Sequence, residues 1–237
     1  MQNHHRKLVA LAACLLPVAL LLPLLRSAKG YSEAKPVPQE KAQAGNDHHG
    51  FAGSSSCAGR GCHGAVQPNA HGVGQNEFST WGRQDPHARA FEVLKSARAQ
   101  LMAENLAPLN GGKTIKAHED PKCLVCHSTP AFAVGDTPEM REHQSRGISC
   151  ETCHGAAAKD GKGWLSAHTE KTWEKKPTAE KEQAGMKVLS EPQRLSAACV
   201  GCHVGSATQD LNHDLMAAGH PRLVFEASAY LANLPRH

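Results

Sequence analysis

The chain is short of the side chains from which a soluble protein usually builds its core. Only 4% of its 237 residues are aromatic and 40% are apolar, and part of the apolar share lies at the N-terminus. No stretch alternates apolar and polar residues as a half-buried strand would. The 21 glycines and 14 prolines indicate many turns and loops. The sequence therefore predicts a mainly helical fold with extensive loops and little or no β-sheet, whose core needs apolar bulk from a source other than side chains.

Outside its N-terminus, the chain also lacks an excess of either charge. Residues 1–30 carry four of the 26 Lys and Arg and none of the 22 Asp and Glu, so the remainder holds 22 of each sign. The formal net charge of +4 therefore comes from the N-terminal segment. Because a nucleic-acid-binding domain would need a basic patch, the composition argues against nucleic acid as a partner.

Cysteine is present in a pattern. Eight of the nine cysteines form four pairs, each followed directly by histidine, and only Cys14 is left over. The second, third and fourth motifs are Cys-x-x-Cys-His (Cys123–His127, Cys150–His154 and Cys199–His203), and the first is stretched (Cys57–His63). Two thiols at this spacing can add to the two vinyl groups of one porphyrin, and the next imidazole can bind its iron. The motifs predict four covalently attached haem c groups. Their attachment cysteines are Cys57, Cys62, Cys123, Cys126, Cys150, Cys153, Cys199 and Cys202, and their proximal iron ligands are His63, His127, His154 and His203.

Cysteine pairs have two other common uses. They form half-sites for structural zinc, and in exported proteins they form disulfides. Zinc would need two pairs to converge on each metal, and neither use explains the histidine that follows every pair. In the stretched first motif, four residues must bulge outward between the cysteines, which Gly59 and Gly61 make easier.

The first 30 residues are typical of a targeting segment. A basic head at His4–Lys7 precedes an uncharged apolar run over residues 8–25 and small residues up to Gly30. Cleavage as a signal peptide is favoured over retention as a membrane anchor, since two prolines interrupt a run that is barely long enough to span a bilayer. A lipoprotein site at Cys14 is disfavoured, because the apolar run continues past it. Each option exports the chain, so we expect a periplasmic or equivalent compartment, with the protein soluble or tethered.

The rest of the chain is expected to form one domain. Residues 31–50 predict a flexible linker, and residues 51–237 predict a tetrahaem cytochrome c domain. Its clearest helix is predicted to begin at Asp85-Pro86 and end before Pro108, with one face carrying His87, Phe91, Leu94, Leu101 and Met102. Further helical segments are predicted over residues 137–144 with Thr137 as the cap, from 164 to 168, and over residues 191–202, 210–218 and 225–234.

The second ligand of each iron decides the function. A haem with protein ligands on both faces can exchange electrons but has no place for a substrate. Methionine is scarce, with five residues in the chain, so histidine is the expected second ligand. The candidates outside the motifs and the linker are His71, His87, His118, His143, His168, His213, His220 and His237.

The order and spacing of these residues resemble the cytochrome c-554 type of tetrahaem cytochromes, which are electron carriers. The resemblance is carried by Ser56-Cys57, Cys62-His63, Asp85-Pro86-His87-Ala88, Cys123–His127, Gly147–Gly155, His168 and Cys199–His203, and its most specific part is the Gly-x-x-Cys-Glu-x-Cys-His-Gly string. It implies distal ligation of the His154 haem by His87, of the His203 haem by His168 and of the His63 haem by His220, with a five-coordinate haem on His127. Two additional histidines, His213 and His118, are candidates for the missing second ligand of the His127 haem.

Three functions remain open at this stage. The leading expectation is that the protein is an electron carrier and not an enzyme. Such a carrier docks transiently with a protein donor and a protein acceptor. The second is a reductase of small nitrogen oxides at an open haem on His127, with His118, His143 and Glu119 as nearby acid or base groups. The Cys-x-x-Cys-Lys motif of pentahaem nitrite reductases is absent. The third is a membrane-anchored quinol dehydrogenase, which would be quinone-linked and would need the N-terminal segment retained.

Overall fold

A computed structural model describes residues 50–69, 74–135, 137–158, 163–206 and 213–235. All of them belong to one unit of the chain, Lys41–His237, whereas the unit Met1–Glu40 contains none of them. The expected targeting segment, nearly all of the expected linker, and the candidate ligands His71 and His237 lie outside the described residues.

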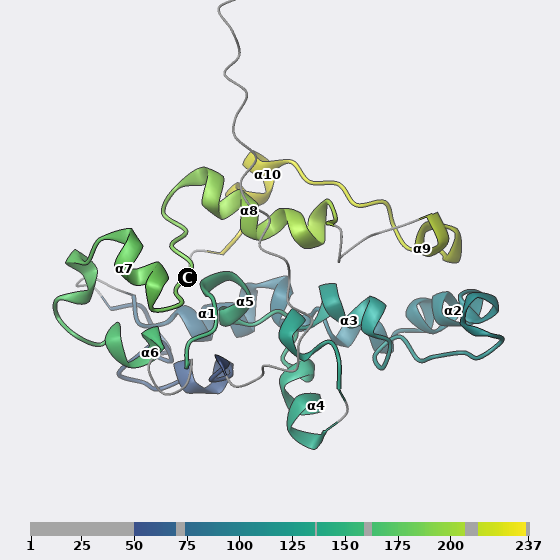
Figure 1. Ribbon diagram of the computed structural model, residues 1–237, viewed down its shortest axis with the longest axis horizontal. Helices are drawn as coiled ribbons and strands as arrows, with labels where there is room; N and C mark the ends of the chain where they lie inside the picture. Colours follow the sequence, from purple (N-terminus) through teal and green to yellow (C-terminus); the bar gives the residue numbers. More distant parts are fainter. Residues whose placement is uncertain (1–49, 70–73, 136, 159–162, 207–212, 236–237) are drawn as a thin grey trace, which may run out of the picture. The chain divides into compact units, whose positions relative to one another are not determined.

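Helices and loops make up the described residues, which include no strand (Figure 1). The mainly helical, loop-rich fold expected from the sequence is thereby confirmed. None of the described helices is both long and apolar enough to cross a membrane. The α-helices are α1 (Glu77–Gln84), α2 (Ala97–Asn105), α3 (Pro121–His127), α4 (Pro138–Ser145), α5 (Cys150–His154), α6 (Trp164–Ala167), α7 (Thr178–Gln183), α8 (Pro192–His203), α9 (His213–Ala218) and α10 (Ala227–Asn233). Short 3₁₀ turns include η2 (Ser54–Cys57), η3 (Pro86–Arg89), η4 (Glu92–Lys95), η5 (Ala107–Asn110), η6 (Pro130–Phe132) and η8 (Trp173–Lys175).

The long helix expected after Asp85 is divided into η3, η4 and α2. Asp85 does cap its start, because the carboxylate accepts a hydrogen bond from the backbone N–H of His87 (2.9 Å). At Ser96 the backbone becomes extended, and the hydroxyl caps α2 by accepting from Ala99 N. The expected single apolar face is therefore wrong: Leu94 is buried, whereas Leu101 beyond the break is 57% exposed.

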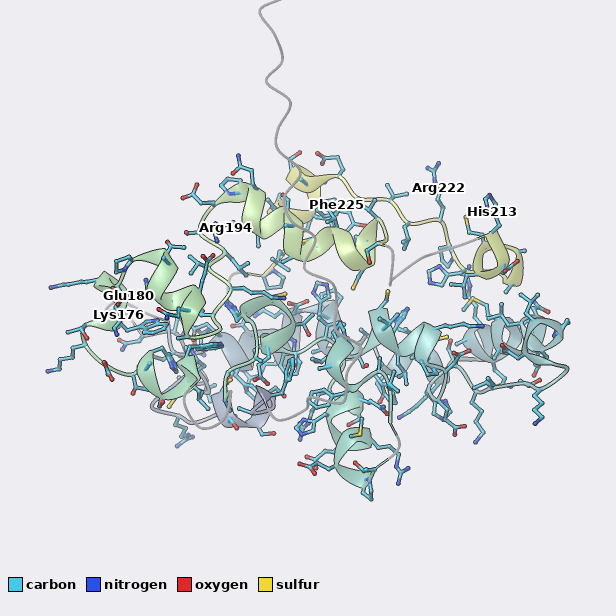
Figure 2. The ribbon with its side chains drawn as sticks, in the orientation of Figure 1. Lys176, Glu180, Arg194, His213, Arg222 and Phe225 are labelled. Atoms are coloured by element: carbon cyan, nitrogen blue, oxygen red, sulfur yellow. The ribbon has the colours of Figure 1, made fainter. Side chains whose placement is uncertain are left out.

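Other boundaries follow the expected signals. Thr137 caps α4, with its hydroxyl accepting from Met140 N. The helices expected near residues 191–202 and 225–234 are present as α8 and α10, and α9 ends before Gly219, whose φ is 113°. Helix α7 was not expected, because its charged sequence has no apolar period. Arg194 of α8, labelled in Figure 2, forms an ion pair with Glu182 of α7.

The side-chain core is small and divided. One cluster of buried residues contains Phe91, Leu94, Ala99, Ala117, Leu124 and Ala133, and the other contains Ala157, Trp164 and Trp173. Among the residues that the structure describes, 17 apolar ones are buried, and six of these are alanines. Such a core buries little apolar area, as the lean composition predicted.

Candidate haem-binding sites

Each of the three Cys-x-x-Cys-His motifs forms the last turn of a helix that ends at the histidine. These helices are α3, α5 and α8. Residues three and four apart lie on one face of a helix. The two sulfur atoms and the imidazole of each motif therefore project from the same side of one turn, which is the arrangement that attachment and ligation of one haem require.

The stretched first motif is a hydrogen-bonded loop instead of a helical turn. Cys57 ends η2, Cys62 N donates to Gly59 O (2.9 Å), and His63 N donates back to Cys57 O (3.3 Å). This loop accommodates the extra residues, so the backbone of His63 still lies within hydrogen-bonding distance of Cys57. Cys57 is buried and Cys62 is exposed. The hydroxyl of Ser54 beside this motif is buried and has no partner among the described protein atoms.

The four motifs meet in an order that differs from their order in the chain. The thiols of Cys57 and Cys150 are within hydrogen-bonding reach, which joins the first motif to the third. Cys153 is close enough to Cys199 for that group's charge to affect its pKa, which joins the third motif to the fourth. The Cys202 thiol is close enough to Cys126 to raise the pKa of that thiol, which joins the second motif to the fourth. The spatial order is first, third, fourth, second.

Glu151, inside the third motif, ties that motif to the chain before the first. Its side chain is 2% exposed. The carboxylate accepts hydrogen bonds from the backbone N–H groups of Ala52 (2.8 Å), Gly53 (2.8 Å) and Ala157 (2.9 Å). Bonds to a buried carboxylate are among the stronger ones in proteins. The sequence identified Glu151 as part of the most specific string but gave no reason for it.

The two glycines that flank the third motif are required by close backbone contacts. Gly147 has φ 66°, and a Cβ there would lie 2.5 Å from the carbonyl oxygen of His87. Gly155 has φ 85°, and a Cβ there would collide with the carbonyl oxygen of Gly185. The close approach at Gly147 lets Ile148 N donate to His87 O (3.0 Å), which holds the His87 segment against the third motif.

Three of the motif histidines each face a histidine from a distant part of the chain. All six rings are half-buried. An imidazole nitrogen binds a metal ion at about 2 Å, so two rings on opposite sides of one ion have centres on the order of 6 Å apart. The pairs, with their centroid separations, are His63 with His168 (6.1 Å), His87 with His203 (6.0 Å) and His127 with His220 (6.4 Å).

Five of these six rings have Nδ1 tied to an oxygen acceptor, which leaves Nε2 as the metal-binding nitrogen. Metal-ligating histidines typically donate their other N–H in this way, which fixes the tautomer and the ring orientation. The acceptors are Glu77 Oε2 for His63 (2.9 Å), Asp85 Oδ1 for His87 (2.8 Å), Ala90 O for His127 (2.9 Å), Leu165 O for His168 (2.6 Å) and Pro221 O for His220 (2.7 Å). Sequence reasoning missed Glu77, because no spacing rule links it to His63.

These partners differ from the ones that the resemblance implies. His87 faces the fourth motif, where the third was expected, and His168 faces the first, where the fourth was expected. His220 faces the second motif, whose haem was expected to be five-coordinate. His154 ends α5 and is half-buried.

The other candidate histidines lie in different surroundings. His213, labelled in Figure 2, is exposed at the start of α9. His118 lies edge-on to Phe91, with Nε2 3.7 Å from Glu119. His143 stacks on Phe132 with ring centres 4.4 Å apart.

Burial and hydrogen bonding shift the pKa values of several side chains at these sites. Burial lowers the pKa of His127 and of His203, which favours the neutral imidazole that binds metal. The hydrogen bond to Asp85 raises the pKa of His87 in spite of its burial. Burial raises the pKa of Cys123 and of Cys153 to about 11. Such thiols are poor thiolate ligands, whereas an apolar environment suits a sulfur in a thioether.

These features fit haem better than they fit zinc or disulfides. Among the described residues, no group of three or more His, Cys, Asp or Glu side chains could hold a metal ion as a zinc site would. The eight cysteines of the motifs are all free. What the side chains do provide is paired imidazoles at the separation that two axial ligands need, each pair beside a cysteine motif.

Comparison with known proteins gives one match. A protein-family model described as cytochrome c554 and c-prime matches residues 56–155, a stretch that contains the first three motifs and His87. Searches of the curated proteins and of the solved structures find no match. The family match supports placing the chain among the cytochromes c, which carry covalently bound haem and transfer electrons.

Proposed function

We propose that the chain is an exported tetrahaem c-type cytochrome that relays electrons between a protein donor and a protein acceptor. The observation that carries this proposal is the pairing of three motif histidines with distant histidines at centroid separations of 6.0 to 6.4 Å. A haem held between the two histidines of each pair would have a protein ligand on both faces and would leave no position for a substrate.

The chain's own residues hold and tune the haems. The eight motif cysteines attach them, and the motif histidines are the proximal ligands. His168, His87 and His220 would be the distal ligands of the haems on His63, His203 and His127, respectively. A bound haem supplies one-electron chemistry at its iron, at potentials that bis-histidine ligation and nearby hydrogen bonds tune.

The spatial order of the motifs supports a relay. The first and second motifs lie at the two ends of the series, and neighbouring motifs approach each other through their cysteines. An electron that enters at one end therefore has a continuous route to the other. We assign one end to the donor and the other to the acceptor, each docking transiently.

The alternative of a reductase at His127 loses its main support, because His220 faces that histidine. The quinol dehydrogenase alternative depends on whether residues 1–30 are retained. N-terminal sequencing of the mature protein tests it: a start near Tyr31 removes this alternative, and an intact Met1 in the membrane fraction restores it.

Low-temperature EPR of the oxidised, haem-loaded protein, with a haem count by mass spectrometry, tests the proposal. We expect four haems per chain and a low-spin haem on His127, so that His220→Ala creates a new high-spin ferric signal. His213→Ala is the matched control on the same segment and should leave the spectrum unchanged. A high-spin His127 haem in the unaltered protein, with no effect of His220→Ala, would contradict the proposed ligation and favour the reductase.

A further inference from the structure

We propose that Arg98 and Asn105 of α2 are positioning residues that hold His220 opposite His127, so that a brace on α2 decides whether the second haem site is closed. This inference rests on the pairing of His127 with His220 in the proposed function. The pairing shows that His220 faces His127, and the present inference concerns which contacts keep His220 in that position.

The brace consists of two hydrogen bonds to the carbonyl groups that precede His220. Asn105 Nδ2 donates to Ala218 O (3.0 Å), and Arg98 Nη2 donates to Gly219 O (2.9 Å). Carbonyl groups at the C-terminal end of a helix have no N–H partner within the helix, so donors from outside normally hydrogen-bond to them. Here both outside donors come from one helix, and both act within two residues of the ligand.

Helix α9 is short, and its buried end lies against α2. It has six residues, too few to be stable alone. Ala218 is its buried residue, whereas His213 and Met216 are exposed. Gly219, with φ 113°, turns the chain out of α9 toward His220 and lies beside Met102 of α2. The contact with α2 therefore sets where His220 lies.

The proximal side of the site is held independently of α9. Leu124 of α3 packs in the same buried cluster as Ala99 of α2, and His127 Nδ1 is bonded to Ala90 O (2.9 Å). Helix α2 and the second motif thus rest on a common core, to which α9 is attached from outside. Breaking the brace should loosen the distal ligand and leave the proximal ligand in place.

The test measures opening of the His127 site in the haem-loaded, full-length protein. Carbon monoxide binding to the reduced form and the high-spin ferric EPR signal both report an open iron, and their increase over the unaltered protein separates the His127 site from the His154 haem, to which no distal histidine is assigned. Apparent carbon monoxide affinity scales with the fraction of open sites. We expect that affinity to rise about fivefold in Arg98→Ala or Asn105→Ala and on the order of twentyfold in the double variant.

Two variants on the same helix serve as controls. Gln100→Ala removes an amide whose described hydrogen bond is to Glu104 within α2, and it should leave carbon monoxide affinity unchanged. Arg98→Lys keeps a positively charged donor at this position, and it should open the site less than Arg98→Ala does. A structural defect of α2 in general would affect Gln100→Ala as well, and that result would contradict a specific brace.

His220→Ala separates failure of the brace from failure of the proposed pairing. If His220→Ala opens the site and the double variant does not, the brace is refuted and the pairing stands. If His220→Ala leaves carbon monoxide binding unchanged, the pairing fails and the brace fails with it. With both correct, adding the double variant to His220→Ala produces no further change, because the two act on one ligand.

Discussion

The paired histidines are oriented by two chemically different kinds of acceptor. Carboxylates of Glu77 and Asp85 hold His63 and His87, whereas a backbone carbonyl holds His127. A carboxylate partner makes an imidazole a stronger electron donor than a carbonyl does, and a more basic ligand favours ferric over ferrous iron. With the proposed haems bound, these acceptors would spread the reduction potentials of otherwise similar haems without touching the iron.

Asp85→Asn tests this at one residue. Asparagine is as good a helix cap as aspartate, so the cap at η3 should survive while the carboxylate is lost. We expect the haem between His87 and His203 to rise in potential on the order of 50 mV, equivalent to about a tenfold change in relative affinity for the two iron states. A spectroelectrochemical titration measures it, with exposed Glu92→Gln as the control. A fall in potential, or no change, would contradict the role assigned to Asp85.

At the scale of elements, the junction between η3 and α5 depends on Gly147. Gly147→Ala places a Cβ 2.5 Å from the carbonyl oxygen of His87 at φ 66°. We expect a loss of unfolding free energy of about 3 kcal/mol or more, from the strained backbone and the collision together. Denaturant unfolding of the haem-loaded protein measures it.

Gly112→Ala is the matched control for that variant. Gly112 also has positive φ, 80°, but a Cβ there would meet nothing within 4 Å. It should cost about 1 kcal/mol from backbone strain alone. Equal losses in the two variants would show that the contact with the His87 segment contributes nothing.

The sequence predicted those elements whose ends carry local signals. Thr137 and the Asp85-Pro86 pair were identified as helix starts because capping is decided within a few residues. The break at Ser96 was missed, since a serine that caps the next helix looks like an ordinary serine inside one. Helix α7 was missed because it has no apolar period of its own; in the structure its Glu182 pairs with Arg194 of α8.

The candidate attachment residues can be recognised in the sequence and stay a prediction, whereas the pairing of the histidines in the structure could not be foreseen. Two thiols and an imidazole within one turn define a haem site locally. The partner of each motif histidine depends on which distant loop crosses that motif, and the glycines and buried carboxylates that route those loops have no recognisable period. Thus His87 is adjacent in fold to the third motif through Ile148, yet its ring faces His203 of the fourth.

At the scale of the whole molecule, the side chains alone do not account for a stable fold. The two buried clusters are small and rich in alanine. The longest described helix, α8, has 12 residues, and isolated helices of that length or shorter are marginal in water. Neighbouring motifs approach one another at their cysteines, which are the groups that would attach the haems. In the proposed haem-loaded protein, porphyrin would therefore supply much of the apolar contact between the helices.

We accordingly expect the chain to lack a cooperative fold without haem. When all eight motif cysteines are replaced by serine, the protein should show weak helical circular dichroism, no unfolding transition in denaturant, and rapid amide exchange throughout. The haem-loaded protein should unfold cooperatively. Replacing only the cysteines of the first motif, Cys57 and Cys62, serves as a graded control, because the other three haems remain and most of the fold should persist. A sharp unfolding transition in the haem-free chain would mean that the two side-chain clusters suffice, and that the haems occupy a fold that forms without them.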